Sequence, residues 1–171
     1  MKVRLAYPIQ SDSIVDGEGL RSVIWFQGCK HYCKGCHNPE TWNMNQGYEV
    51  DIEQLKKEIE ELELQDGVTF SGGDPMFQPE ALLYLLKVVK ENGMNTWVYS
   101  GYTFDKLLEI AIEKSIYRDI LNNIDVLVDG LFELENKSLN AIFRGSTNQR
   151  IIDVKKSIKE GQVCLVDKYK A

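Results

Sequence analysis

The stretch GVTFSGGDP, residues 67–75, decides the fold because it joins a short apolar run to a turn that a helix follows. Gly67 to Ser71 has the length and the β-branched and aromatic content of a buried strand, and Gly-Gly-Asp-Pro is typical of a turn. Residues 79–92 then show the apolar spacing of a helix, which Gly93 would end. The stretch predicts one unit of strand, turn and helix.

The same alternation continues on both sides of this unit. Upstream, residues 21–27 (RSVIWFQ) are a β-rich run, and Asp51 can cap the helix IEQLKKEIEEL. Downstream, a strand at 96–100, a helix at 104–114 and a strand at 124–129 are expected. Alternating elements indicate a parallel sheet with right-handed crossovers, and about four such units are too few for a closed eight-stranded barrel. The fold predicted is therefore α/β, an open partial (βα) barrel with a mostly parallel sheet.

Composition limits the number of domains, the kinds of partner and the location that we expect. The 171 residues are 43% hydrophobic and contain no linker or repeat, so we expect a single domain spanning residues 1–171. The net charge is −6 and basic residues are dispersed, which argues against nucleic acid as a partner. No apolar run approaches the ~18 residues of a membrane span, and the N-terminus lacks the pattern of a signal peptide. We expect a cytoplasmic protein without membrane contact.

Three of the four cysteines lie within eight residues, where Cys29, Cys33 and Cys36 form the pattern C-x3-C-x2-C. In an intracellular chain this spacing indicates metal or redox chemistry and not a disulfide framework. Three thiolates on one loop can hold a cubane iron-sulfur cluster and leave its fourth iron without a local protein ligand. Such an iron can bind a substrate directly, as the open position of a catalytic zinc site does.

A structural zinc site is the alternative for these cysteines, with His31, His37 or Cys164 as the fourth ligand. Structural zinc sites usually combine two short ligand pairs. Here one triplet follows a predicted strand, and Cys164 lies far away in the sequence. The arrangement favours the cluster over zinc.

Other candidate residues also have two interpretations. Gly72-Gly73-Asp74-Pro75 can be an ordinary turn, or a place where exposed backbone groups approach a charged ligand. Asp129 ends a predicted strand at the edge where ligands gather, yet an acidic residue there can equally cap a helix or turn. His37 is either a group close to the cluster or a solvent-facing loop residue.

The motifs together resemble a known family. FQGCKHYCKGCHNPETW (26–42) resembles the cluster loop of radical S-adenosylmethionine (SAM) activating enzymes, and SGGDP (71–75) resembles their GGE-type motif. DGEGLR (16–21) is similar to the DGPGxR segment of activases of glycyl radical enzymes. Further segments resemble the activating proteins of anaerobic ribonucleoside-triphosphate reductases, namely TWVYSGYTFDKL (96–107), DVLVDGLFE (125–133) and FRGSTNQR (143–150).

This resemblance implies a radical SAM type of open barrel and a defined set of site residues. The cluster ligands would be Cys29, Cys33 and Cys36, and SAM would chelate the open iron. No side chain is assigned as catalytic, because the cluster and SAM carry the chemistry. The expected SAM contacts are Gly35, Cys36, His37, Gly72, Gly73, Asp74 and Asp129. Two of these positions depart from the common pattern, because Asp74 stands where Glu is frequent and Gly35 where an aromatic is frequent.

The implied activity is reductive cleavage of SAM at a 4Fe-4S cluster, which generates a glycyl radical on the large subunit of the anaerobic reductase. An electron donor such as flavodoxin or ferredoxin is the second expected partner. Docking candidates are the DGEG run and RGSTNQR (144–150). The alternatives are activation of another glycyl radical enzyme such as pyruvate formate-lyase, or a non-catalytic iron-sulfur or zinc binding module.

Overall fold

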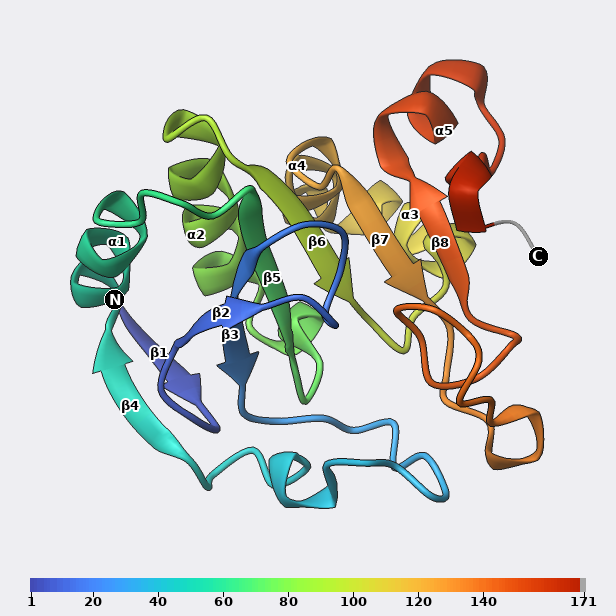
Figure 1. Ribbon diagram of the computed structural model, residues 1–171, viewed down its shortest axis with the longest axis horizontal. Helices are drawn as coiled ribbons and strands as arrows, with labels where there is room; N and C mark the ends of the chain where they lie inside the picture. Colours follow the sequence, from blue (N-terminus) through green and yellow to red (C-terminus); the bar gives the residue numbers. More distant parts are fainter. Residues whose placement is uncertain (170–171) are drawn as a thin grey trace.

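The computed structural model describes residues 1–169 and contains one sheet with helices packed against it (Figure 1). The strands are β1 (Lys2–Leu5), β2 (Gln10–Ser13), β3 (Arg21–Phe26), β4 (Tyr48–Asp51), β5 (Gly67–Gly72), β6 (Asn95–Tyr99), β7 (Val126–Asp129) and β8 (Arg150–Asp153). The α-helices are α1 (Ile52–Glu60), α2 (Pro79–Glu91), α3 (Phe104–Glu113), α4 (Ser115–Asn122) and α5 (Val154–Glu160). Short 3-10 turns are η1 (Pro39–Thr41), η2 (Pro75–Phe77), η3 (Leu134–Asn136) and η4 (Asp167–Tyr169).

The sheet has the order β4-β1-β3-β5-β6-β7-β8, and β2 pairs with β3 beside this path. The central strands β3, β5, β6 and β7 are parallel to one another. Antiparallel strands flank them, because β1 pairs antiparallel with β3 and with β4, β2 with β3, and β8 with β7. Within residues 1–169 no pairing joins β4 to β8. The open partial barrel predicted from the sequence is confirmed.

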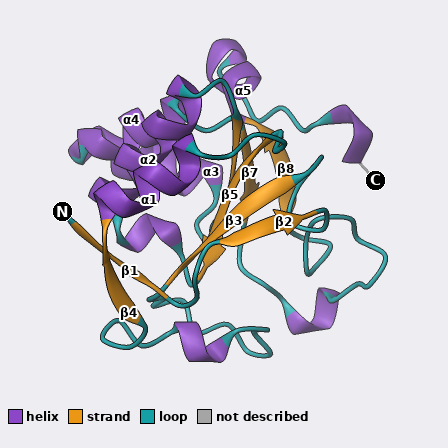
Figure 2. Cartoon of the chain, turned by 60° about the vertical axis from the view of Figure 1, so that its left-hand side comes forward, coloured by secondary structure: helices purple, strands orange, loops and turns teal. Residues whose placement is uncertain are grey.

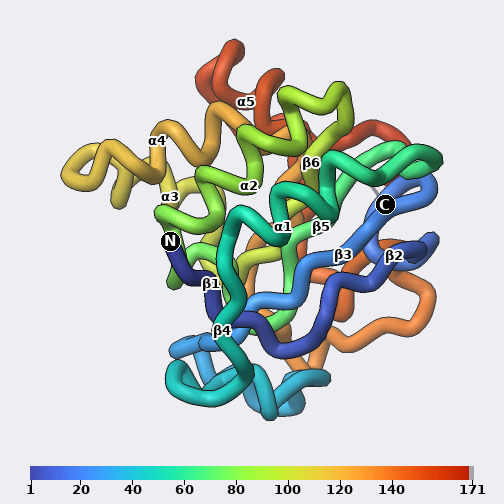
Figure 3. The backbone as a smooth tube through the Cα atoms, turned by 90° about the vertical axis from the view of Figure 1, so that its left-hand side faces the viewer, coloured from blue at the N-terminus to red at the C-terminus, as the bar shows by residue number. Residues whose placement is uncertain are grey.

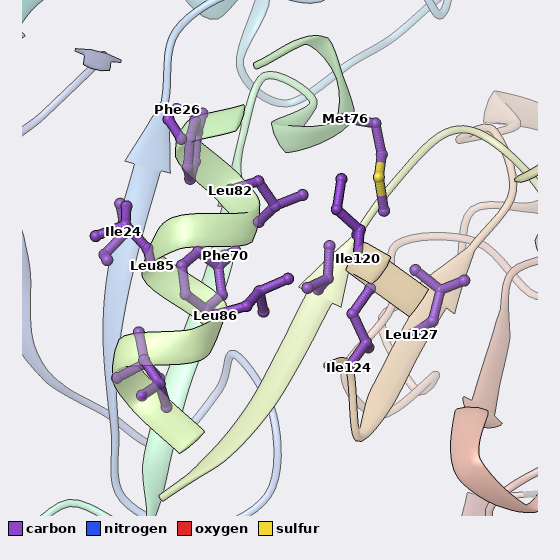
Figure 4. Packing of buried hydrophobic residues seen from close by; sticks show 14 of the residues in the cluster. Ile24, Phe26, Phe70, Met76, Leu82, Leu85, Leu86, Ile120, Ile124 and Leu127 are labelled. Atoms are coloured by element: carbon purple, nitrogen blue, oxygen red, sulfur yellow. The ribbon is translucent and has the colours of Figure 1, made fainter. Parts of the chain in front are cut away.

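Helices α1 to α4 lie together on one side of the sheet (Figure 2). Buried hydrophobic residues of these helices and of the strands form the core. Figure 4 shows Leu82, Leu85 and Leu86 of α2 facing Phe26 of β3 and Phe70 of β5. These side chains are 0% exposed. Each buried leucine or phenylalanine contributes roughly 1.5–3 kcal/mol to folding. The apolar spacing read from the sequence is what holds α2 against the sheet.

Local hydrogen bonds fix the helix starts. Asp51 caps α1 by accepting a hydrogen bond from the Glu53 N–H at 2.9 Å, and the Thr103 hydroxyl accepts one from the Lys106 N–H at 3.1 Å to cap α3. Such caps satisfy N–H groups that lack a partner within the helix. No helix among residues 1–169 has the length and apolarity needed to cross a membrane.

The carboxyl ends of the parallel strands meet at one edge of the sheet. The loop after β3 and the segment between β7 and β8 lie at this same end of the molecule (Figure 3). The loop after β3 carries the cysteine triplet, and the Gln27 side chain fixes it by donating to the carbonyls of Glu40 at 3.1 Å and Asn43 at 2.8 Å. The topology thus brings segments distant in sequence around one site.

Candidate cofactor site at the carboxyl edge of the sheet

A cavity of about 190 Å³ opens at the carboxyl ends of β5, β6 and β7. One wall is the cysteine loop, with Cys29, Cys33 and Cys36. The opposite walls come from the turn after β5, the end of β6 and the segment 130–149. Ligand sites in open α/β sheets lie at this edge, so both position and lining fit a cofactor site.

The three cysteines all line this cavity as free thiols. Cys29 is buried, while Cys33 and Cys36 are partly exposed. Burial raises the pKa of the Cys29 thiol to about 11 and also raises the pKa of Cys33. Because thiolates are the metal-binding form, metal binding here would release protons. Within residues 1–169 no three histidine, cysteine, aspartate or glutamate side chains are grouped closely enough to hold a metal ion.

The backbone of the cysteine loop is tied to neighbouring segments. Gly28 N–H donates to the Thr41 carbonyl at 2.7 Å, and Cys29 N–H donates to the Trp42 carbonyl at 3.1 Å. Cys36 N–H closes a tight turn onto the Cys33 carbonyl at 3.1 Å. The loop therefore has a defined path.

The turn after β5 places Gly72, Gly73 and Asp74 along the cavity. Gly73 also has a structural role that the sequence does not show. A Cβ atom there would lie 2.4 Å from the Gly28 carbonyl oxygen, so the small residue is required by the start of the cysteine loop itself. Asp74 is 1% exposed and bonds to protein groups on three segments.

Two other expected contacts do not line the cavity. Asp129 is 0% exposed, and its carboxylate accepts hydrogen bonds from the Phe104 N–H and from Arg150. The bond to the Phe104 N–H at the start of α3 is compatible with the capping alternative, and the neighbouring Gly130 lines the cavity. Gly35 is exposed and lies against Leu134. His37 does line the cavity, with its ring 5.2 Å from that of Phe132.

Several lining residues were not among the cofactor contacts expected from the sequence, namely His31, Asn38, Ser71, Tyr99, Ser100, Gly101, Gly130, Phe132, Gly145 and Gln149. Gln149 shows how the distant segment is held, because its amide oxygen accepts from the N–H groups of Gly145 and Ser146 while its nitrogen donates to the Gly130 carbonyl. The FRGSTNQR motif (143–150) did indicate a turn in this segment. Its polar residues are typical of a tight turn, but spacing alone does not show which cavity such a turn closes.

A second hollow, of about 540 Å³, adjoins the first. The two share His37, Asn38, Ser71, Tyr99 and Gly145. Its rim carries apolar side chains that are largely exposed, namely Ile14 at 73%, Val15 at 69%, Leu139 at 94% and Ile142 at 57%. We call this hollow the rim groove. Exposed apolar side chains gathered around a hollow mark interaction surfaces.

Comparison with known proteins defines the class. A family described as the 4Fe-4S single cluster domain matches residues 15–152, which include the cysteine loop, the turn after β5 and most of the rim groove. The fold and the site therefore define a protein of the 4Fe-4S single cluster domain class.

Curated relatives narrow this class. The chain is 35% identical to the anaerobic ribonucleoside-triphosphate reductase-activating protein of Pasteurella multocida strain Pm70, over 81% of this chain and 90% of that protein. It is 33% identical to the protein of that name in Escherichia coli K12, over 84% and 92%. The chain belongs to the family of anaerobic ribonucleoside-triphosphate reductase-activating proteins, which confirms the resemblance seen in its motifs.

Two further similarities are more partial. The pyruvate formate-lyase-activating enzyme of Clostridium pasteurianum is 43% identical over 61% of this chain, and the match spans 46% of that enzyme. The chain thus spans about half the length of this relative. Among solved structures, QueE from Escherichia coli is similar with a TM-score of 0.47 and 19% identity, over 60% of this chain and 54% of QueE.

Proposed function

We propose that this protein generates a glycyl radical on an anaerobic ribonucleoside-triphosphate reductase, using a 4Fe-4S cluster and SAM. One observation supports this proposal above the others: three cysteine thiols and the Gly72-Gly73-Asp74 turn line one cavity in a chain of the activating-protein family. When bound and reduced, the cluster supplies the electron that cleaves the S–C5′ bond of SAM into methionine and a primary carbon radical, which takes a hydrogen atom from the target glycine.

The residues present fit such a cluster. Cys29, Cys33 and Cys36 provide three sulfur ligands from one loop, which is the donor type that iron-sulfur clusters use. The thiols must draw together and lose their protons when the cluster binds. The backbone contacts of the loop hold its two ends while this happens. A cluster held by these three cysteines would leave one iron without a protein ligand, where SAM would bind.

The remaining walls would orient SAM and exclude water. Phe132 and Tyr99 contribute aromatic surface, and the glycines Gly72 and Gly130 leave room because they add no side chain to the wall. A primary carbon radical would attack any nearby C–H bond, so a closed and shaped site protects the enzyme. The partner would complete the closure of the site, because the cavity and the rim groove share lining residues.

The rim groove is the place where the glycine-bearing segment of the reductase would enter. Its exposed apolar rim suits an uncharged extended segment, and the shared residues lead from the groove to the cavity. Both docking candidates from the sequence border this region, since Asp16 and Arg144 line the groove. A small reduced carrier such as flavodoxin or ferredoxin would supply the electron. Because free thiols and the cluster need a reducing compartment, we place the protein in the cytoplasm.

A single anaerobic sample tests this function. After reconstitution with iron and sulfide, the protein should bind about four of each per chain and show the spectrum of a 4Fe-4S cluster. With dithionite and SAM it should then release 5′-deoxyadenosine. A zinc-bound protein, or a cluster that leaves SAM intact, would contradict the proposal.

Activation of pyruvate formate-lyase is the second candidate, because the match to the Clostridium pasteurianum enzyme reaches 43% identity. Purified reductase and purified pyruvate formate-lyase can be offered in parallel reactions. A glycyl radical on the reductase alone is expected. A radical on pyruvate formate-lyase alone would reverse the assignment and leave the SAM chemistry intact.

A further inference from the structure

The buried carboxylate of Asp74 joins three separate segments around the cavity. One oxygen, Oδ2, lies 2.6 Å from His31 Nε2, 2.9 Å from Ser100 Oγ and 3.0 Å from Gly101 N. The other, Oδ1, accepts from the Met76 N–H at 3.0 Å. His31 belongs to the cysteine loop, Ser100 and Gly101 follow β6, and Met76 lies in η2.

These contacts are unevenly divided between the two carboxylate oxygens of Asp74. Three donors approach Oδ2 and one approaches Oδ1, and each oxygen offers about two lone-pair positions. The residue is 1% exposed, and its donors are protein groups from separate segments. The carboxylate therefore links these segments around the cavity.

His31 connects this carboxylate to the cluster ligands, because it stands between Cys29 and Cys33 in the sequence. Its side chain is 13% exposed, and its ring packs 4.8 Å from the ring of Tyr102 and 5.3 Å from that of Phe77. The hydrogen bond joins His31 Nε2 to Asp74 Oδ2.

Gly101 shows how closely the imidazole is seated. A Cβ atom at position 101 would lie 2.6 Å from His31 Cδ2, so only glycine leaves room for the ring. The Gly101 N–H meanwhile donates to the same carboxylate oxygen as the imidazole. The loop between the first two cysteines is therefore fastened to the end of β6 by packing and by a shared acceptor.

We infer that Asp74 is a positioning residue, and that the His31–Asp74 contact is a strut that fixes the Cys29–Cys33 segment in the place where the cluster is assembled. This inference refines the site of the proposed function. It gives Asp74 a task different from the direct SAM contact expected from the sequence. The contact should hold residues 28–36 in place even before a cluster or SAM is bound, so its effect can be measured in the cluster-free protein.

The first experiment measures hydrogen exchange of residues 28–36 in the protein free of cluster. His31→Ala and Asp74→Ala should each speed exchange in this segment about tenfold, because each removes a hydrogen bond to a charged group. His31→Gln should restore slow exchange, since its amide nitrogen can donate from the same side. Asp74→Asn, which retains a single oxygen acceptor, should lie between Asp74→Ala and the unchanged protein.

Two matched controls separate the strut from ordinary capping. Asp51 accepts the N–H two residues onward at 2.9 Å, as Asp74 accepts that of Met76 at 3.0 Å, but Asp51 is exposed and outside the cavity. Asp51→Ala removes such a cap and should leave exchange at 28–36 unchanged. Lys30→Ala, an exposed neighbour of His31, should do the same.

The second readout is spectroscopic. After reconstitution, His31→Ala and Asp74→Ala should hold less iron, and the reduced cluster should show altered EPR g values that His31→Gln returns to those of the unchanged protein.

Exchange at 28–36 within twofold of the unchanged protein in either alanine variant would overturn the inference, because a strut needs both ends. A change confined to SAM affinity in Asp74→Ala would also overturn it. If the proposed function itself were wrong, the unchanged protein would fail to cleave SAM while the exchange result still stood.

Discussion

Arg150 and Asp129 face each other across the antiparallel pair of β7 and β8 and make a two-point contact. Arg150 Nε lies 3.0 Å from Asp129 Oδ1, and its terminal nitrogen lies 2.6 Å from Oδ2. The hydrogen bond to Asp129 raises the pKa of Arg150 above its usual value. Asp129 also accepts the Phe104 N–H at 2.7 Å. The pair ties β8 to the start of α3.

Removing the arginine should be costly, because Asp129 would stay buried without its cation. We expect Arg150→Met to lower the free energy of unfolding by about 2 kcal/mol, less than for a fully buried pair because Arg150 is partly exposed. Asp105→Asn removes the exposed partner of Arg150 and should cost below about 1 kcal/mol. Urea denaturation checks both values. Equal effects in the two variants would contradict this account of the pair.

Arg21 is a buried arginine that contacts several segments, and its guanidinium lies 5.5 Å from the ring centre of Trp97. It donates to Thr69 Oγ1 at 2.7 Å and to the Glu18 carbonyl at 2.9 Å, which holds the DGEG run in place. Burial lowers its pKa to about 10. We predict that Arg21→Met costs about 3 kcal/mol and changes tryptophan fluorescence, whereas Arg118→Met at an exposed position costs below about 0.5 kcal/mol. A cost for Arg21→Met no larger than that for Arg118→Met would show that the guanidinium is not needed there.

The assignment of the three cysteines as cluster ligands predicts which variants can still assemble a cluster. Single replacement of Cys29, Cys33 or Cys36 by Ala should abolish cluster assembly, while Cys164→Ala should leave it intact, because only the triplet lines the cavity. Iron and sulfide analysis after anaerobic reconstitution measures this. Loss of the cluster in Cys164→Ala would point to four cysteine ligands and no open iron.

The rim groove can be tested separately from SAM chemistry. Ile142→Asp places a charge on its exposed apolar rim and should reduce glycyl radical formation at least about tenfold, with slow SAM cleavage in the absence of reductase unchanged. Ile112→Asp alters an isoleucine that is 78% exposed on α3 and should leave both reactions as they were. EPR and 5′-deoxyadenosine assays measure the two. Similar radical yields in both variants would argue that the reductase docks elsewhere.

The central strands and the first three helices could be predicted from the sequence because their apolar spacing is strong. Residues 68–70 and 82–89, for example, are buried in the way that their patterns indicate. Two of the flanking antiparallel strands, β2 and β4, gave no such signal. β2 reads QSDS and β4 reads YEVD, and their residues are mostly exposed. These segments are strands because they pair with a neighbouring strand, and their composition alone does not indicate it.

The candidate site was predictable where residues adjoin in sequence, as in the cysteine triplet and the Gly72-Gly73-Asp74 turn. The contact between His31 and Asp74 could not be predicted, because it joins positions 43 residues apart through a buried hydrogen bond. The role of Asp129 was open for a related reason. Its partner Arg150 comes from β8, a short antiparallel strand that has no clear sequence pattern.

The central claim is that this protein removes a hydrogen atom from a glycine of the anaerobic reductase. The most direct measurement uses reductase labelled with deuterium at the glycine Cα positions, mixed anaerobically with the reconstituted protein, SAM and dithionite. We predict a glycyl radical EPR signal on the reductase and deuterium in 5′-deoxyadenosine, because direct abstraction carries the label there. Cleavage of SAM to unlabelled 5′-deoxyadenosine, with folded reductase present and no radical on it, would contradict the claim.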